Sequence, residues 1–119
     1  MDKKEIQKQC NSWNEKIQRE YQSTKAHPKY LEHKIKIDNF TKDNLNKISS
    51  PKYKVFSIAR QNVHNQEEYP IFFIKERQIF EENGKLEWRY FGSLFNIINS
   101  KVNYKTTTSF IPERNITEL

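Results

Sequence analysis

The dipeptide Asn83-Gly84 constrains the fold of this chain more than any other feature of the sequence. Both residue types tolerate positive φ, so the pair favours a two-residue type I′ turn between antiparallel strands. Such a turn sets the register, because the residues that flank it must face each other. We therefore predict a hairpin from Ile71 to Phe91. The predicted pairs are Glu82 with Lys85, Glu81 with Leu86, Phe80 with Glu87, Ile79 with Trp88, Gln78 with Arg89 and Arg77 with Tyr90.

The two faces of this hairpin are predicted to differ in polarity, because side chains alternate between the faces of a strand. One face is expected to pack on a helix and carries Phe73, Ile79, Leu86, Trp88 and Tyr90. The other face is expected to meet water or a partner and carries Glu76, Gln78, Glu82, Lys85, Glu87 and Arg89. Arg77 is a cation on the apolar face, where it either stacks on an aromatic ring or has a functional role.

The N-terminal segment has the periodicity of an amphipathic helix. Its apolar positions are spaced by four, three, four and four residues, which places them on one face of a helix. These positions are Ile6, Cys10, Trp13, Ile17 and Tyr21. Asp2 can cap the start, and Ala26-His27-Pro28 ends the helix. The stripe either docks on the sheet of the same chain or contacts a partner, in which case Trp13 and Ile17 are the interface residues.

The middle of the chain has weaker signals. Residues 30–40 fit either a short strand, with Ile35 and Ile37 on one face, or a loose helical turn. Thr41 is expected to cap a short helix through Leu45 and Ile48, which ends before Pro51. A first strand is then expected around Val55 to Val63, and Tyr69-Pro70 opens the second.

After the hairpin, Gly92-Ser93 is expected to break the sheet. The apolar run Leu94 to Ile98 fits a short buried helix capped by Ser93, although a run of this length also fits a strand. The last strand is predicted from Val102 to Phe110, because apolar and polar side chains alternate there. Pro112 ends it, and residues 112–119 are expected to form a loose tail.

These elements define an α+β fold, with an N-terminal amphipathic helix and a short second helix packed on a roughly four-stranded antiparallel sheet. A chain of 119 residues is close to the commonest size of one domain. We predict a single domain, 1–119, mainly helical over 1–50 and antiparallel sheet over 51–111. No apolar run resembles a signal peptide or a membrane span, and Cys10 is the sole cysteine. We expect a cytoplasmic protein without contact to a membrane.

Several kinds of chemistry are excluded by the residues present. Two glycines, Gly84 and Gly92, are too few for a loop that cradles phosphate or a dinucleotide. The three histidines, His27, His33 and His64, lack the spacing of a metal site, so we expect neither a metal nor a cofactor. No motif therefore identifies catalytic residues, and we favour a non-catalytic protein over an enzyme.

The positive charge of the chain favours a negatively charged partner. The net charge is +6, and residues 25–54 hold eight lysines against three acidic residues. A concentrated basic segment with interleaved aromatic residues is typical of proteins that bind nucleic acid, including RNA. The leading hypothesis is therefore a non-catalytic binding protein. The residues predicted to contact nucleic acid are Lys29, Lys34, Lys36, Lys52, Lys54, Tyr30 and Tyr53.

Two alternatives come from other classes. The first is an interaction protein that binds or inhibits another protein, for which the basic charge favours an acidic partner, or that assembles with copies of itself. It would act through the helical stripe or the charged hairpin face. The second is a metal-free ribonuclease, which needs only an acid, a base and a cation near the phosphate. His64, Glu76 and Arg89 are its candidate catalytic residues. In element order, the chain resembles small ribonucleases and ribonuclease toxins of the barnase and RelE type, a resemblance of architecture alone, which adds a metal-free ribonuclease to the alternatives.

Overall fold

The hairpin predicted from Asn83-Gly84 forms the centre of the sheet. A computed structural model describes residues 1–22, 28–62 and 71–119, and there β2 (Ile71–Glu82) pairs with β3 (Lys85–Ile98) in the predicted register. All six predicted pairs are present, from Arg77 with Tyr90 to Glu82 with Lys85 beside the turn. Asn83 and Gly84 have φ of 53° and 77°, which is the conformation that a type I′ turn requires.

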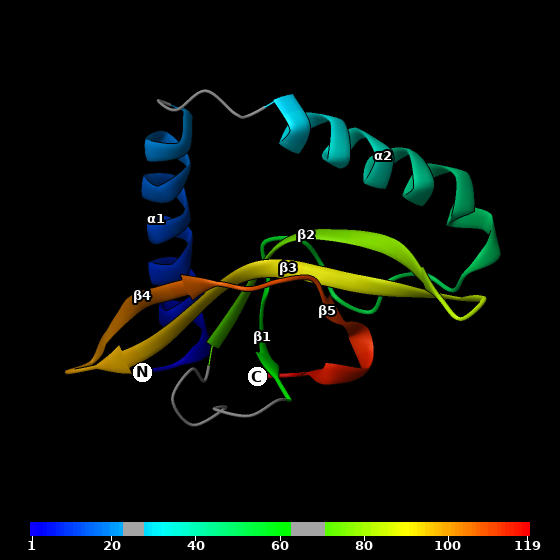
Figure 1. Cartoon of the computed structure of the whole chain (residues 1–119). Helices are drawn as coiled ribbons and strands as arrows, with labels where there is room; N and C mark the ends of the chain where they lie inside the picture. The colour runs from blue at the N-terminus through cyan, green and yellow to red at the C-terminus, as the bar shows by residue number, and fades with distance from the viewer. Residues whose placement is uncertain (23–27, 63–70) are drawn as a thin grey trace.

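The sheet is antiparallel, and strands that precede and follow the hairpin in the sequence complete it. Its order is β4-β3-β2-β1-β6, and β5 also pairs with β3. The added strands are β1 (Ile58–Gln61), β4 (Lys101–Thr107), β5 (Ile111–Pro112) and β6 (Ile116–Thr117). Two helices, α1 (Lys3–Gln22) and α2 (Pro28–Asn44), pack on this sheet, with the short 3-10 helices η1 (Leu45–Lys47) and η2 (Glu113–Asn115) in the connections (Figure 1). The predicted α+β class is confirmed. The part of the chain that the structure describes contains no helix suited to spanning a bilayer.

A β-bulge at Lys75 changes which side chains share a face. Ile74 pairs with Gly92 and Glu76 pairs with Phe91, so one extra residue enters β2 between them. The bulge reverses the alternation, because side chains beyond an inserted residue point to the opposite face. The prediction that Phe73 shares a face with Ile79 and Trp88 is therefore wrong. Phe73 lies in a separate cluster with Ile71 and Phe95, against α1.

Each face of the sheet has its own hydrophobic core. The face of Ile79, Trp88 and Tyr90 was expected to pack on a helix, but it is covered mainly by the segment before β1 and by the C-terminal segment. Side chains of those two segments in or against this core are Ile48, Tyr53, Ile111 and Ile116. Helix α1 covers the other face with the stripe predicted from its spacing, and Ile6 and Cys10 are buried there. Trp13 donates from Nε1 to the Val102 carbonyl at 2.8 Å, so the stripe docks on the chain's own sheet.

Helix α2 is one continuous helix where the sequence suggested two shorter elements. Residues 30–40 form neither a strand nor a loose turn, and Thr41 lies inside the helix instead of capping one. No residue of α2 is buried, so the apolar pattern that predicts a helix is weak there. Helix α2 runs along the outer edge of β2 (Figure 1) and covers Gln78, which is only 6% exposed. Part of the hairpin face predicted to meet water or a partner is thus covered.

The region after Tyr90 differs most from the prediction. Gly92 and Ser93 continue β3, and Leu94 to Ile98 extend that strand instead of forming a helix. A Cβ atom on Gly92 would lie 1.8 Å from the Phe73 carbonyl oxygen, so this glycine allows the close approach of the two strands at the bulge. A second bulge, at Lys105, interrupts the alternation predicted from Val102 to Phe110.

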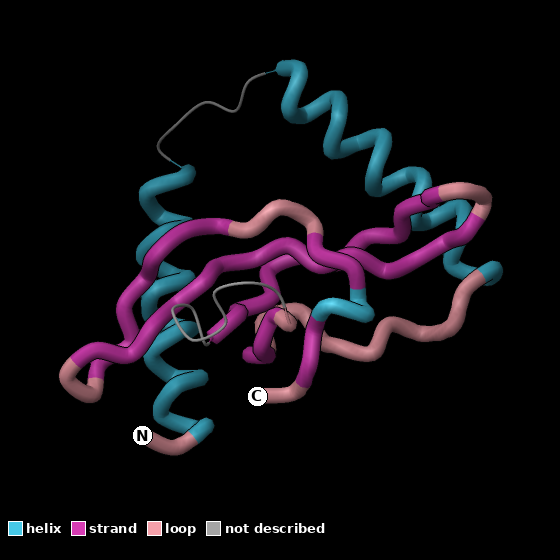
Figure 2. The backbone as a smooth tube through the Cα atoms, turned by 60° about the horizontal axis from the view of Figure 1, so that its bottom comes forward, coloured by secondary structure: helices cyan, strands magenta, loops and turns pink. Residues whose placement is uncertain are grey.

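The C-terminal residues were expected to be a loose tail, but they are part of the fold. Ile116 is buried and pairs with Gln61 of β1, and its carbonyl accepts a hydrogen bond from the Tyr53 hydroxyl at 2.8 Å. Tyr90 donates to the Glu113 carboxylate at 2.5 Å. Figure 2 shows this segment returning alongside the sheet. Pro112 was expected to end the ordered structure, yet it pairs with Arg89 at the end of β5.

Candidate functional site

A pocket lies where the end of α1, the start of α2 and the sheet meet. We call it the interhelical pocket, and its volume is about 410 Å³. Four of its eight lining residues are apolar or aromatic and four are polar or charged, so the pocket combines apolar surface with groups that can orient a ligand. The lining residues are Ile17, Gln18, Tyr30, Lys75, Glu76, Phe91, Tyr104 and Thr107.

The bulge in β2 positions the charged group of this pocket. Lys75 is the inserted residue, and bulges often redirect a side chain next to a functional site. Burial lowers the pKa of the Lys75 amine, and no acid or acceptor among the described residues pairs with this amine. A partly buried cation without a counter-charge is unfavourable, because burial removes water that would otherwise solvate it. The pocket therefore favours a ligand with negative charge.

Three aromatic residues line the same pocket as Lys75. Tyr30 comes from the first turn of α2 and is 54% exposed, so one ring is available at the mouth of the pocket. Phe91 of β3 and Tyr104 of β4 line the sheet side. The Tyr104 ring lies between Trp13 and Phe95, at centroid distances of 6.3 and 5.9 Å, which holds it in place. A flat aromatic ligand can stack on such surfaces.

The negative charge of the Glu76 carboxylate is balanced by neighbouring side chains. The Lys34 amine lies 2.9 Å from its carboxylate, and Gln78 donates to the same oxygen at 2.6 Å. Burial lowers the pKa of Lys34, but the hydrogen bond and charge of Glu76, together with Asp38, outweigh burial and raise it. The carboxylate of Glu76 thus fixes α2 on β2, and Lys75 retains its excess positive charge in the pocket.

Two residues with buried oxygens, unpaired in the described part of the chain, are neighbours of lining residues but do not line the pocket themselves. The Ser93 hydroxyl is fully buried, and its cross-strand neighbour Thr107 lines the pocket. Asn14 is 9% exposed and lies one helical turn before Gln18. The oxygen atoms of both side chains lack a hydrogen-bond partner within the described ranges. Buried polar atoms normally have partners, so these two oxygens are unusual features of the fold.

The residues predicted to bind nucleic acid are divided between two faces of the hairpin. Lys29, Lys34 and Lys36 lie on α2, and Lys34 contacts Glu76 on the face of Phe91. Lys52 and Lys54 lie in the segment that packs on the opposite face. Tyr53 in that segment is buried, with its ring 5.6 Å from that of Tyr90, so it belongs to the core. Of the seven residues, Tyr30 alone lines the interhelical pocket.

The other predicted residues are also accounted for. His64 lies outside the described residues. Glu76 and Arg89 share a hairpin face, but Arg89 pairs with Glu82 and Glu87 and lies over the Phe80 ring, 4.8 Å from its centroid. Arg77 donates to the Tyr53 carbonyl at 2.8 Å, which gives it a structural contact. Trp13 packs on the sheet, and Ile17 lines the interhelical pocket.

The key residue that sequence reasoning missed is Lys75. Strand alternation assigns it no special position, because the pattern does not reveal an inserted residue. A glycine inside a strand is a signal of a bulge, and Gly92, opposite Ile74, was the available clue. Within residues 1–22, 28–62 and 71–119, no cluster of three or more histidine, cysteine or acidic side chains is arranged to hold a metal ion.

The structure thus belongs to the α+β class, with two helices on an open antiparallel sheet and a pocket between them that is lined by Lys75, Glu76 and aromatic rings. No protein-family model, curated protein or solved structure matches this chain. Its function must therefore be inferred from the geometry of the chain itself.

Proposed function

We propose that the protein binds single-stranded nucleic acid and that the interhelical pocket receives one nucleotide of the strand. The observation that carries the proposal is the Lys75 amine, which has no counter-charge among the described residues and lies in a pocket lined by Tyr30, Phe91 and Tyr104. Single-stranded nucleic acid offers the complementary groups, because its bases stack on aromatic rings and its phosphates bind cations.

The polar residues of the pocket support the same ligand. Gln18 and Thr107 have side chains that can donate and accept hydrogen bonds, as recognition of a base edge or a ribose hydroxyl requires. The net charge of +6 favours association with a polyanion through long-range attraction. Binding in this mode needs neither a metal nor a cofactor, and it leaves the nucleic acid intact.

The test is an equilibrium titration of a fluorescein-labelled ten-residue oligouridylate, followed by anisotropy at several salt concentrations. We expect binding that weakens as salt increases, because phosphate contacts release counterions. Lys75→Met removes the charge and keeps the aliphatic stem, and Tyr30→Ala removes an exposed ring. Loss of one base stack costs about 1–3 kcal/mol, so Tyr30→Ala should weaken binding roughly 5- to 150-fold.

Lys42→Met is the matched control, because it removes one exposed lysine charge outside the pocket, from the helix that also carries Tyr30. We expect it to change the affinity less than about twofold. Equal affinity of wild type, Lys75→Met and Tyr30→Ala would overturn the proposal. Absence of binding would overturn it in favour of a protein partner, for which α2 presents Leu31 and Ile35, 47% and 58% exposed. Cleavage of the RNA in EDTA would overturn it in favour of the ribonuclease alternative.

A further inference from the structure

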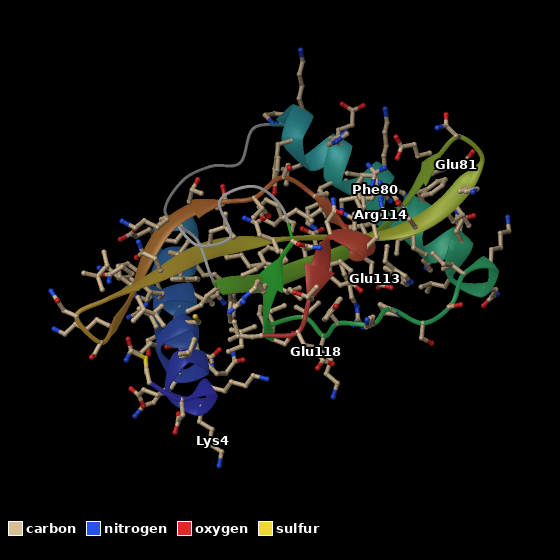
Figure 3. The ribbon with its side chains drawn as sticks, turned by 90° about the horizontal axis from the view of Figure 1, so that it is seen from below. Lys4, Phe80, Glu81, Glu113, Arg114 and Glu118 are labelled. Carbon is tan, nitrogen blue, oxygen red and sulfur yellow. The ribbon has the colours of Figure 1, made fainter. Side chains whose placement is uncertain are left out.

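A second depression lies along the first half of α1. We call it the lysine groove, and its volume is about 590 Å³. The lining residues are Lys3, Lys4, Gln7, Lys8, Asn11, Ser12, Glu15, Ser57 and Ile58. Three lysines and one acidic residue give this groove an excess of positive charge. In the described part of the chain, the three amines have neither an ion pair nor a hydrogen bond, and Figure 3 shows Lys4 extending outward from the start of α1.

An exposed aromatic ring stands beside this groove. Phe56 is 52% exposed and has φ of 67°, a conformation that is unfavourable for a bulky side chain. Two hydrogen bonds hold it there. Its amide donates to the Ile74 carbonyl at 2.6 Å, and its carbonyl accepts from Gln7, which lines the groove, at 2.9 Å. Strained residues of this kind persist where the surrounding structure enforces them, and they gather at ligand sites.

The groove and the interhelical pocket lie along one ridge of α1. Lys4, Lys8, Asn11 and Glu15 line the groove, and Gln18 lines the pocket. Their spacing of four, three, four and three residues places all five side chains on the same side of the helix. With a rise of 1.5 Å per residue, Lys8 and Gln18 are separated by about 15 Å along the helix axis. A ligand several nucleotides long can therefore reach both depressions.

We propose that the nucleic-acid strand continues from the interhelical pocket along this ridge and that the lysine groove binds its backbone. Lys3, Lys4 and Lys8 contact phosphates, and the Phe56 ring stacks on a base. This inference rests on the proposed function, because the first nucleotide occupies the interhelical pocket. It adds the path of the strand and requires more than one nucleotide, since a mononucleotide cannot contact both depressions at once.

Oligouridylates of one, three, six and ten residues test this inference. Binding of the mononucleotide is measured by NMR titration and binding of the longer probes by anisotropy. We expect the affinity to increase with length up to about six residues. The double variant Lys4→Gln, Lys8→Gln should leave binding of uridine monophosphate unchanged and should weaken binding of the hexamer about tenfold or more. Its logarithmic salt slope should fall by about 1.4, which corresponds to two phosphate contacts on a single strand.

Phe56→Gly removes the ring and relieves the backbone strain, because glycine adopts positive φ readily. It should weaken hexamer binding and change the melting temperature little, because the relieved strain offsets the lost contact between the Phe56 and Phe73 rings, whose centroids lie 6.2 Å apart. The matched control is Lys85→Gln, Lys101→Gln, which removes two exposed charges at the strand turns.

The outcomes separate this inference from the proposed function. Mononucleotide binding that depends on Lys75, without any gain from longer probes, would overturn the strand path and leave the pocket assignment intact. Equal losses in the groove variant and the control variant would overturn it as well, because the effect would then follow net charge alone. Failure of all probes to bind would overturn both proposals.

Discussion

The hydroxyl oxygen of Thr41 accepts a hydrogen bond from the backbone amide of Ile79 at 2.9 Å. This contact closes the edge of the sheet, because β1 pairs with β2 only near Phe72 and Phe73, so the later amides of β2 that point away from β3 have no strand partner. An open strand edge can pair with another chain, and covering it with a helix prevents this. Helix α2 thus protects the edge through a polar contact, although none of its residues is buried.

Thr41→Val should destabilise the protein by about 1–3 kcal/mol, because it leaves the Ile79 amide without a partner. The same substitution removes the hydrogen bond that Thr41 donates to Gln78 at 2.6 Å. Urea denaturation measures the effect. Thr41→Ser keeps the hydroxyl and should retain most of the stability. A valine variant as stable as the serine variant would show that the edge contact contributes nothing.

The two glycines should respond differently to alanine. Gly92→Ala places a Cβ atom 1.8 Å from the Phe73 carbonyl oxygen, so the two strands must separate. We expect a loss of more than about 3 kcal/mol or failure to fold. Gly84→Ala meets no atom within 4 Å and is strained only by its φ of +77°, which costs about 1–2 kcal/mol. Similar melting temperatures for the two variants would contradict the close approach at the bulge.

Cys10 should be unreactive in the folded protein. Burial raises the pKa of its thiol from the usual 9.0 to about 12, and the side chain is fully buried. A thiol reagent at pH 8 should modify Cys10 only after denaturation, because the reactive form is the exposed thiolate. Rapid reaction of the native protein would contradict the packing of α1.

The same pKa shift predicts a loss of stability in alkali. The thiol ionises in the unfolded chain near pH 9 and in the folded chain only near pH 12, so its contribution is complete below pH 9 and is lost between these values. Denaturation midpoints measured across this range should fall less steeply for Cys10→Ala than for the wild type. Parallel pH profiles of the two proteins would rule out a contribution from the thiol.

The C-terminal segment should be required for stability. Ile116 is 3% exposed and its carbonyl accepts the Tyr53 hydroxyl, so Ile116→Ala should cost about 2–5 kcal/mol. Glu118→Ala, an exposed position two residues later (Figure 3), should have little effect. Thermal unfolding of both variants provides the comparison, and an unchanged melting temperature for Ile116→Ala would mean that the segment is a loose tail after all.

Binding of the oligouridylate should depend on pH through Lys75. Burial lowers the pKa of this amine, so it should lose its charge at a pH below that at which surface lysines titrate. Affinity should decrease as the pH rises through that range. Lys75→Arg should remove this decrease, because arginine remains charged. An identical pH profile for wild type and Lys75→Arg would exclude Lys75 as the titrating group.

The sequence alone predicted the elements whose signal is local. The register between Ile79 and Trp88 follows from the Asn83-Gly84 turn, since two residues with positive φ leave one way to pair the strands. The face of α1 that packs on the sheet follows from the spacing of Ile6, Cys10 and Trp13. The α+β class required only these two signals and the strand patterns beside them.

Tertiary contacts decided the rest. The helical conformation of Tyr30 to Phe40 depends on polar contacts with Glu76 and Gln78, which no periodicity encodes. Leu94 to Ile98 form a strand because β4 pairs with them, although the same apolar run is compatible with a helix. The candidate site also depended on tertiary contacts. Lys75 was not predicted to be a site residue, and Tyr30 was assigned to a different surface.

What the sequence by itself determined is therefore the central hairpin, the buried side of α1 and the positive charge of the chain. The bulge at Lys75, the covered edge of β2 and the order of the C-terminal segment were decided by the tertiary structure. The physical reason is the range of the interactions. A turn or an amphipathic stripe is specified by residues within one or two turns of each other, whereas a bulge forms only when Gly92 and Phe73 meet across strands.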